Sequence, residues 1–325
     1  MTDEAPGADR SNALEHPARQ KRNRRMILLQ SVIAAGFLIA IGFWVALNWS
    51  TVANTFLSMS LGAIAGGVLA ATAGLGASAM AWRAVLRSLG QPAGIVPASV
   101  VYLVGQLAKF IPGGFWAFIY QVALGMRRGL AKTPTLLAGP IAAGVSLAMG
   151  AVACSFGLAR LDIPLPWLYP ILGALPVIAA IVWPPFVNRI VRWGLRVLRR
   201  GERDIRFTRI GIAEIIGWSL LSWFCYGLQL LLLVSGEQHP LTILGTTAIM
   251  AAAQSLGFLA FIFPSGIGVR EGVIVAGLAG VVSPAVALTI ALAARATSTM
   301  ADLVAAGLAR IIELVVTRTR PSAPG

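Results

Sequence analysis

Five charged residues interrupt long apolar stretches of this 325-residue sequence: Lys109, Arg270, Glu271, Arg295 and Asp302. A lysine or arginine at the centre of a bilayer costs about 2.5–3.5 kcal/mol on insertion scales, so each of these charges needs a partner or a function. The five together leave one net positive charge. This balance favours the binding of an anion.

Two breaks in otherwise helical sequence adjoin these charges, KFIPGGFW at 109–116 and IFPSGIGVREG at 262–272. Proline ends the incoming helix, and glycine lets backbone approach closely. We expect a new half-helix after each break, near Phe115 and near Val269, whose free N–H groups and positive dipole end favour a phosphate group. The predicted binding site combines both breaks with the last apolar segment. Its residues are Lys109, Pro112, Gly113, Gly114, Trp116, Gly266, Gly268, Arg270, Glu271, Arg295, Ser298 and Asp302.

The same charges also admit structural interpretations. Lys109 can extend from a helix end toward the headgroups. Glu271 can pair with Arg270 or with Arg295. Asp302 can pair with Arg295, because residues seven apart lie on roughly the same face of a helix. A carboxylate that holds an arginine in place is compatible with a ligand site, and Glu271 is also our candidate for a protonatable coupling group. Further candidates for the lining are Gln106, Tyr120, Gln121 and Gln254.

The elements that must position these residues are membrane-spanning helices. The sequence is 57% hydrophobic and only 12% charged, with a mean hydropathy of +0.80, whereas soluble domains are about a quarter charged. About 20 apolar residues cross a bilayer, and six segments are that long. They are 26–47, 56–80, 134–158, 165–185, 210–234 and 284–313, while the blocks 95–126 and 241–282 contain the breaks. The fold class is therefore an all-α polytopic membrane protein.

The order of segments repeats: span, span, broken block, span, and then the same again. Each broken block contributes an even number of crossings, whether it is a re-entrant hairpin or a pair of full spans. The two halves, 26–160 and 161–315, therefore have opposite orientations, as in the inverted repeats of secondary transporters. Re-entrant hairpins entering from opposite sides would bring both breaks to a cavity near mid-membrane.

The net charge of +14 does not indicate nucleic-acid binding, because most of the lysines and arginines fall on one side of the expected topology. By the positive-inside rule this places both termini in the cytoplasm, with 1–25 a disordered basic tail and 316–325 a second tail. The basic loop 186–209 has arginines three or four apart, a spacing compatible with a short helix on the inner leaflet. The alternatives for this segment are an ordinary positive-inside loop and a specific role in binding anionic lipids. Glu214 is expected at the inner surface.

Motifs for enzymatic chemistry are missing from the sequence. It has no HExxH, nucleophile elbow, Walker A or dinucleotide-binding fingerprint, and we expect neither a metal nor a cofactor. Cys154 and Cys225 lie far apart in apolar segments and are expected to be buried. Asp162 and Glu237, on separate outer loops, are the weak basis for an alternative interpretation as a glycosyltransferase.

The segments GQLAKFIPGGFW (105–116) and FPSGIGVREG (263–272) resemble the paired motifs of the flippase-like transmembrane domain of lysylphosphatidylglycerol synthases. The likeness covers roughly 26–315. In bifunctional members this domain is implicated in moving the modified lipid to the outer leaflet, and other members are linked to polyprenyl-phosphate sugars or hopanoid-type lipids. The bifunctional enzymes continue into a soluble aminoacyl-transferase domain, which is not found in this sequence. The resemblance therefore implies the transport part alone.

We therefore expect a flippase of the bacterial plasma (inner) membrane, and not an enzyme. Its substrate would be a phosphate-bearing lipid, either a polyprenyl-phosphate-linked sugar or an anionic or modified phospholipid. The alternative is a non-transporting accessory subunit of a lipid–glycan synthase, which would then be a protein partner.

Overall fold

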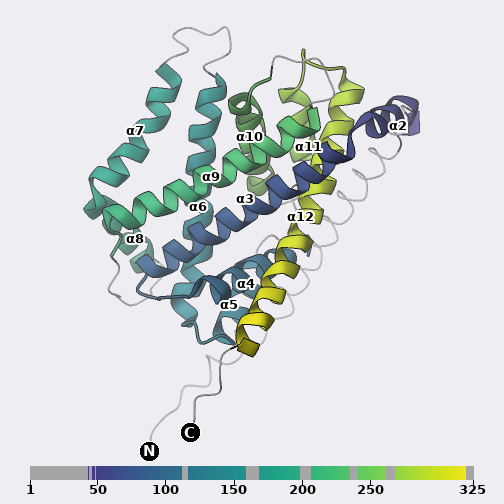
Figure 1. The fold of residues 1–325 in the computed structure, drawn as a ribbon. Helices are drawn as coiled ribbons and strands as arrows, with labels where there is room; N and C mark the ends of the chain where they lie inside the picture. The colour runs from purple at the N-terminus through teal and green to yellow at the C-terminus, as the bar shows by residue number, and fades with distance from the viewer. Residues whose placement is uncertain are drawn as a thin grey trace, which may run out of the picture.

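The computed structural model describes residues 43, 46–47, 49–111, 116–158, 168–197, 206–234, 241–260, 266 and 268–319. All regular secondary structure in these ranges is helical, as predicted for the fold class (Figure 1). The elements are α2 (Trp49–Ser58), α3 (Leu61–Ser88), α4 (Ile95–Gln106), η1 (Leu107–Phe110), α5 (Trp116–Met126), α6 (Lys132–Leu158), α7 (Leu168–Val182), α8 (Pro184–Val197), α9 (Arg209–Val234), α10 (Ile243–Leu259), α11 (Val269–Gly277) and α12 (Pro284–Thr319).

Among the described residues, three helices, α3, α6 and α9, are long and apolar enough to cross a membrane by themselves. The predicted span 56–80 has the wrong boundaries. A new helix begins at Leu61, because the Ser60 hydroxyl accepts a hydrogen bond from the Ala63 N–H at 3.0 Å. That helix continues through Ser88 and stops before Gly90, which has a φ of 74°.

Each predicted broken block consists of two short helical segments, one on either side of the break. In the first block, α4 tightens into η1, and α5 follows the break. In the second, α10 and α11 flank the break. Figure 1 shows α4 and α5 beside the carboxyl end of α12, and α10 and α11 at the opposite end of the molecule. Residues 112–115 of the first break lie outside the described residues, as do 261–265 of the second.

The helices pack around α3 and α9, which lie against each other. The last helix of each half then packs on the opposite half, because α6 contacts α9 and α10 while α12 contacts α3 and α4. One buried cluster surrounds Trp82 and Leu86 of α3, and another joins Leu230 of α9 to Met250 of α10 and Ile290 of α12. The first cluster also includes Ile212 and Trp223 of α9 and so lies between the halves, whereas the buried residues of the second cluster all belong to the second half.

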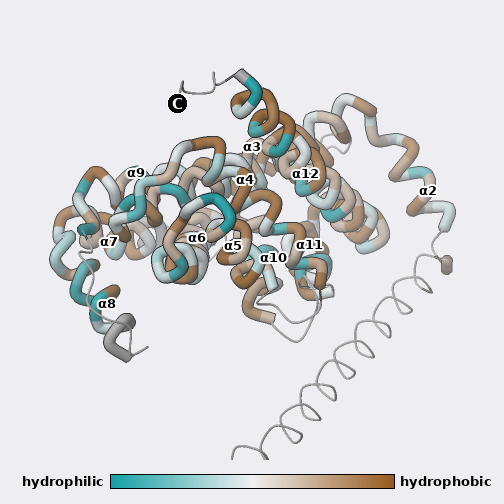
Figure 2. The backbone as a smooth tube through the Cα atoms, turned by 90° about the horizontal axis from the view of Figure 1, so that it is seen from below, coloured by the Kyte–Doolittle hydropathy of each residue, from teal (hydrophilic) through white to brown (hydrophobic). Residues whose placement is uncertain are grey.

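The remaining elements agree in part with the predicted segments. The segment 165–185 appears as α7, and α8 follows after a bend of 77°. The predicted basic helix is α8, where polar residues gather in Figure 2. The last helix continues six residues past the predicted end at 313. Most of the predicted span 26–47 falls outside the described residues, and so do the outer-loop acids Asp162 and Glu237.

Candidate functional site

A cavity of about 270 Å³ lies at the centre of the helical bundle. Its walls come from both broken blocks and from the long helices α3, α6, α9 and α12. Four of the five membrane-embedded charges predicted from the sequence line it: Lys109, Arg270, Arg295 and Asp302. Helices far apart in the sequence therefore bring these charges to one place.

The first broken block is tied to the last helix by an ion pair. Lys109 Nζ lies 2.7 Å from Oδ2 of Asp302, whose side chain is only 4% exposed, while the lysine side chain is 32% exposed. The predicted alternative in which Asp302 pairs with Arg295 is thus not the arrangement found. Seven-residue spacing put those two side chains near one face of α12, but a cation from another segment lies closer to Asp302.

A second pair is centred on Glu271. Its Oε1 accepts a hydrogen bond from Arg295 at 2.6 Å, and its Oε2 accepts one from the Gly268 N–H at 2.6 Å. Of the two arginines considered as partners, Glu271 thus uses Arg295. The N–H at the start of α11, which we expected to be free for a ligand, is already hydrogen-bonded to this carboxylate. Glu271 therefore fixes the start of α11 against α12.

Gln229 of α9 binds the turn of α12 that carries Arg295, and it was not among the residues predicted from the sequence. Its amide nitrogen, which has two N–H groups to donate, lies within hydrogen-bond distance of three acceptors: the Ala294 carbonyl at 2.9 Å, Thr297 Oγ1 at 2.8 Å and Ser298 Oγ at 2.9 Å. The side chain is fully buried. Buried polar groups need such partners, so a glutamine within the apolar run of α9 was the available signal. Gln229 positions the backbone that carries Arg295.

Arg270 has no hydrogen bond or ion pair with any of the described residues, although it lines the cavity. Its side chain passes over Gly257 of α10, where an added Cβ would collide with the arginine Cγ. Gly266 also approaches Gly257 closely and has a φ of +63°, a conformation that favours glycine. Gly257 therefore makes room for the Arg270 side chain, and Gly266 permits the close approach to the Gly257 backbone.

The rest of the lining contains many neutral polar groups. Gln106, Gln121 and Gln254 line the cavity as predicted, together with Ser255. Tyr120 lies elsewhere, in a separate recess. Gln121 is 1% exposed, and neither its Oε1 nor Ser255 Oγ has a hydrogen-bond partner among the described residues. Buried polar atoms without partners cost about 1–3 kcal/mol each, which a bound molecule or water in the cavity would offset.

The remaining predicted residues divide into four groups. Gly266 and Ser298 line the cavity, whereas Gly268 and Glu271 support it from behind without lining it. Trp116 is half-exposed at the start of α5 and does not belong to the lining among the described residues. Pro112, Gly113 and Gly114 lie outside the described residues.

The family described as "Lysylphosphatidylglycerol synthase TM region" matches residues 27–306. This chain belongs to that family. The matched range contains both broken blocks and every residue of the cavity described above. Family membership, together with the apolar helices, supports a multi-pass membrane protein of the lipid-related, flippase-like class. A search of curated proteins finds no match.

Proposed function

We propose that this protein is a flippase that moves a phosphate-bearing lipid between the leaflets of the bacterial inner membrane. The observation that carries the proposal is Arg270, a cation without a partner among the described residues, in a cavity deep within apolar helices. Lys109 and Arg295 each have a carboxylate partner, so Arg270 supplies the single net charge. A phosphate would give that charge its counterion.

The dimensions of the cavity support a headgroup as the bound part. About 270 Å³ corresponds to the share of roughly nine water molecules and lies just below the usual range of drug-sized pockets. The hydrocarbon tail would remain in the bilayer. Gln121 and Ser255 offer hydrogen-bonding atoms for hydroxyls, so glycosyl or glycerol headgroups fit this lining.

Transfer would proceed by alternation of two inverted repeats, with both termini in the cytoplasm. Two observations support the repeat. The pattern G-x-L-A-x₃-P-x-G occurs at 105–114 and at 257–266, and the same four residues, GLAR, occur near the end of each half, at 157–160 and 307–310. In addition, α6 and α12 occupy equivalent positions, because each is the last helix of its half and packs on helices of the opposite half. The two halves would then move relative to each other around the central cavity, which residues of both halves line.

The ion pairs suggest how one of the two alternating conformations is stabilised. Lys109 belongs to the first hairpin and Asp302 to the second half, so their contact joins the halves on one side of the cavity. Separation of this pair would accompany opening. Because the sequence has no nucleotide-binding motif, uphill transfer would depend on an ion gradient or on consumption of the lipid at the far leaflet. Glu271 remains our candidate for a protonatable coupling group.

Proteoliposomes test the proposal with two fluorescent probes, a labelled phosphatidylglycerol and a labelled short-chain polyprenyl-phosphate sugar. Dithionite destroys the label in the outer leaflet only, so the rate of further loss reports transfer. Arg270→Gln should lower the initial rate at least about tenfold, since a hydrogen bond to a charged group contributes about 1.5–3 kcal/mol. Arg318→Gln, an exposed substitution in the last turn of α12, is the matched control.

Wild-type rates equal to those of protein-free vesicles for both probes would contradict a flippase and favour the accessory-subunit interpretation. A glycosyltransferase would instead transfer sugar in a reaction that depends on Asp162 or Glu237. Normal rates in a folded Arg270→Gln protein would show that the cavity is not the transfer route.

A further inference from the structure

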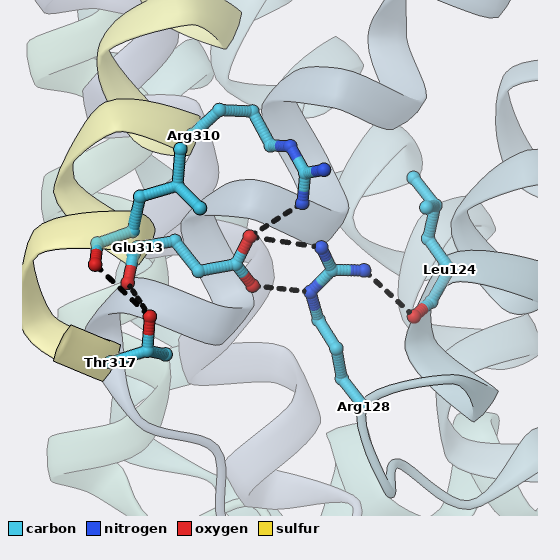
Figure 3. A network of polar contacts seen from close by, with 6 residues as sticks. Leu124, Arg128, Arg310, Glu313 and Thr317 are labelled. Atoms are coloured by element: carbon cyan, nitrogen blue, oxygen red, sulfur yellow. Dashed lines mark hydrogen bonds and ion pairs between the residues drawn. The ribbon is translucent and has the colours of Figure 1, made fainter.

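A second recess, of about 490 Å³, lies between α4, α5 and α12, at the end of the molecule that we assign to the cytoplasm. Its walls contain Arg127, Arg128, Arg310 and Glu313, together with Val104, Tyr120 and Leu124. It shares no lining residue with the central cavity. Figure 3 shows Arg128 and Arg310 reaching toward Glu313 from two sides.

Glu313 holds two of the three arginines in fixed positions. Its Oε1 accepts from Arg128 Nε at 2.8 Å, and its Oε2 accepts from Arg128 at 3.1 Å and from Arg310 at 2.6 Å. Arg128 also donates to the Leu124 carbonyl at 3.3 Å. This two-point contact with a carboxylate gives the Arg128 guanidinium a defined orientation.

The recess has an excess of positive charge. Its three arginines face a single glutamate, which leaves two net positive charges. Arg127 is exposed, and its side chain has no hydrogen bond or ion pair with any of the described residues. A structural tether between α5 and α12 requires only Arg128 and Glu313. The tether therefore does not explain Arg127, nor the additional hydrogen bond that Arg310 donates to Glu313.

The helices that form the recess also carry exposed apolar side chains. Ile119 is exposed on α5, and Ile311, Leu314 and Val315 are exposed on α12. In a membrane these side chains contact lipid tails. Positive charge beside a lipid-facing apolar surface, at the cytoplasmic end of the helices, is an arrangement that binds anionic lipid headgroups.

We propose that this recess binds the phosphate headgroup of an anionic lipid of the inner leaflet. Arg127 and Arg310 contact the phosphate, while Glu313 keeps Arg128 and Arg310 in place. The acyl chains lie along the exposed apolar faces of α5 and α12. Bound there, the lipid connects the first hairpin with the last helix. This site does not depend on transfer through the central cavity.

Native mass spectrometry of the full chain in detergent tests the proposal by titration with phosphatidylglycerol or with zwitterionic phosphatidylcholine. A basic residue near an anionic surface contributes about 1 kcal/mol, which corresponds to roughly fivefold in affinity. Arg127→Gln should thus weaken phosphatidylglycerol binding about fivefold, and Arg127→Gln with Arg310→Gln roughly 25-fold. Phosphatidylcholine should bind at least about fivefold more weakly than phosphatidylglycerol.

Two controls make the result specific. Arg318→Gln removes the same charge from α12 outside the recess and should change affinity less than twofold. Arg270→Gln identifies any lipid adduct that belongs to the central cavity, so failure of that site is distinguishable from failure of this one. Because Arg127 is exposed and without a partner among the described residues, its substitution should leave the melting temperature unchanged.

Three outcomes would overturn the proposal. Equal binding of the two phospholipids would show that the recess does not select an anionic headgroup. Equal weakening by Arg318→Gln would show a diffuse surface effect. Displacement of phosphatidylglycerol by millimolar inorganic phosphate would identify a soluble phosphate, and not a lipid, as the occupant.

Discussion

Lys109→Met and Asp302→Asn remove the same ion pair, yet they should differ in their effect on the free energy of unfolding. Lys109→Met leaves Asp302 as an unpaired carboxylate that is 4% exposed. Removing one partner of a buried pair typically costs about 3–5 kcal/mol. Asp302→Asn leaves a lysine that is 32% exposed at the cavity wall, where water can solvate it. That substitution should therefore cost less, about 1.5–3 kcal/mol, the value of a hydrogen bond to a charged group.

The double variant gives the decisive comparison. With Asp302→Asn already present, Lys109→Met no longer creates an unpaired charge, so the double variant should be more stable than Lys109→Met alone by about 2 kcal/mol. Equilibrium unfolding of the purified chain in detergent, titrated with dodecyl sulfate and followed by circular dichroism, measures all four free energies. Additive effects, or a larger cost for Asp302→Asn, would refute the assignment of this pair as the contact between the first broken block and the last helix.

Three further substitutions probe the cavity. Gly266→Ala introduces a side chain at a φ of +63° and against the Gly257 backbone, so it should destabilise the protein by about 2–4 kcal/mol in the same unfolding assay. Gln121→Leu removes a buried amide oxygen without a hydrogen-bond partner among the described residues, so it should leave stability unchanged or higher while slowing the dithionite-measured transfer of a hydroxylated lipid. Glu271→Gln removes the carboxylate that Arg295 and the start of α11 share; it should lower the free energy of unfolding by about 3–5 kcal/mol and stop transfer in proteoliposomes.

The sequence was sufficient to predict the helical class, the two broken blocks and the charges at the cavity, because each depends on local composition. Proline and glycine end a helix wherever they occur, and a lysine in an apolar run is visible without a structure. Boundaries were less accurate, since the start of α3 is determined by the hydroxyl of Ser60 in a uniformly apolar stretch.

Pairing between charges was not predictable in the same way. The spacing of Arg295 and Asp302 correctly placed both on a similar face of α12, but each found a nearer partner on another helix. Such partners depend on how helices distant in sequence pack together. For the same reason Gln229 was missed, because its role appears only when α9 lies against α12.

Several features of the cavity disfavour folding and are more consistent with a binding function. Arg270 is a cation without a counterion among the described residues, Gln121 has a buried amide oxygen without a hydrogen-bond partner there, and Gly266 adopts a conformation that most residues avoid. A sequence selected for stability alone would replace each of them with an apolar or conformationally favourable residue. Gln121 belongs to the first broken block and Gly266 and Arg270 to the second, yet all three line one cavity. Local conflicts that gather at one place are expected at functional sites, where a ligand completes the interactions that the protein leaves open.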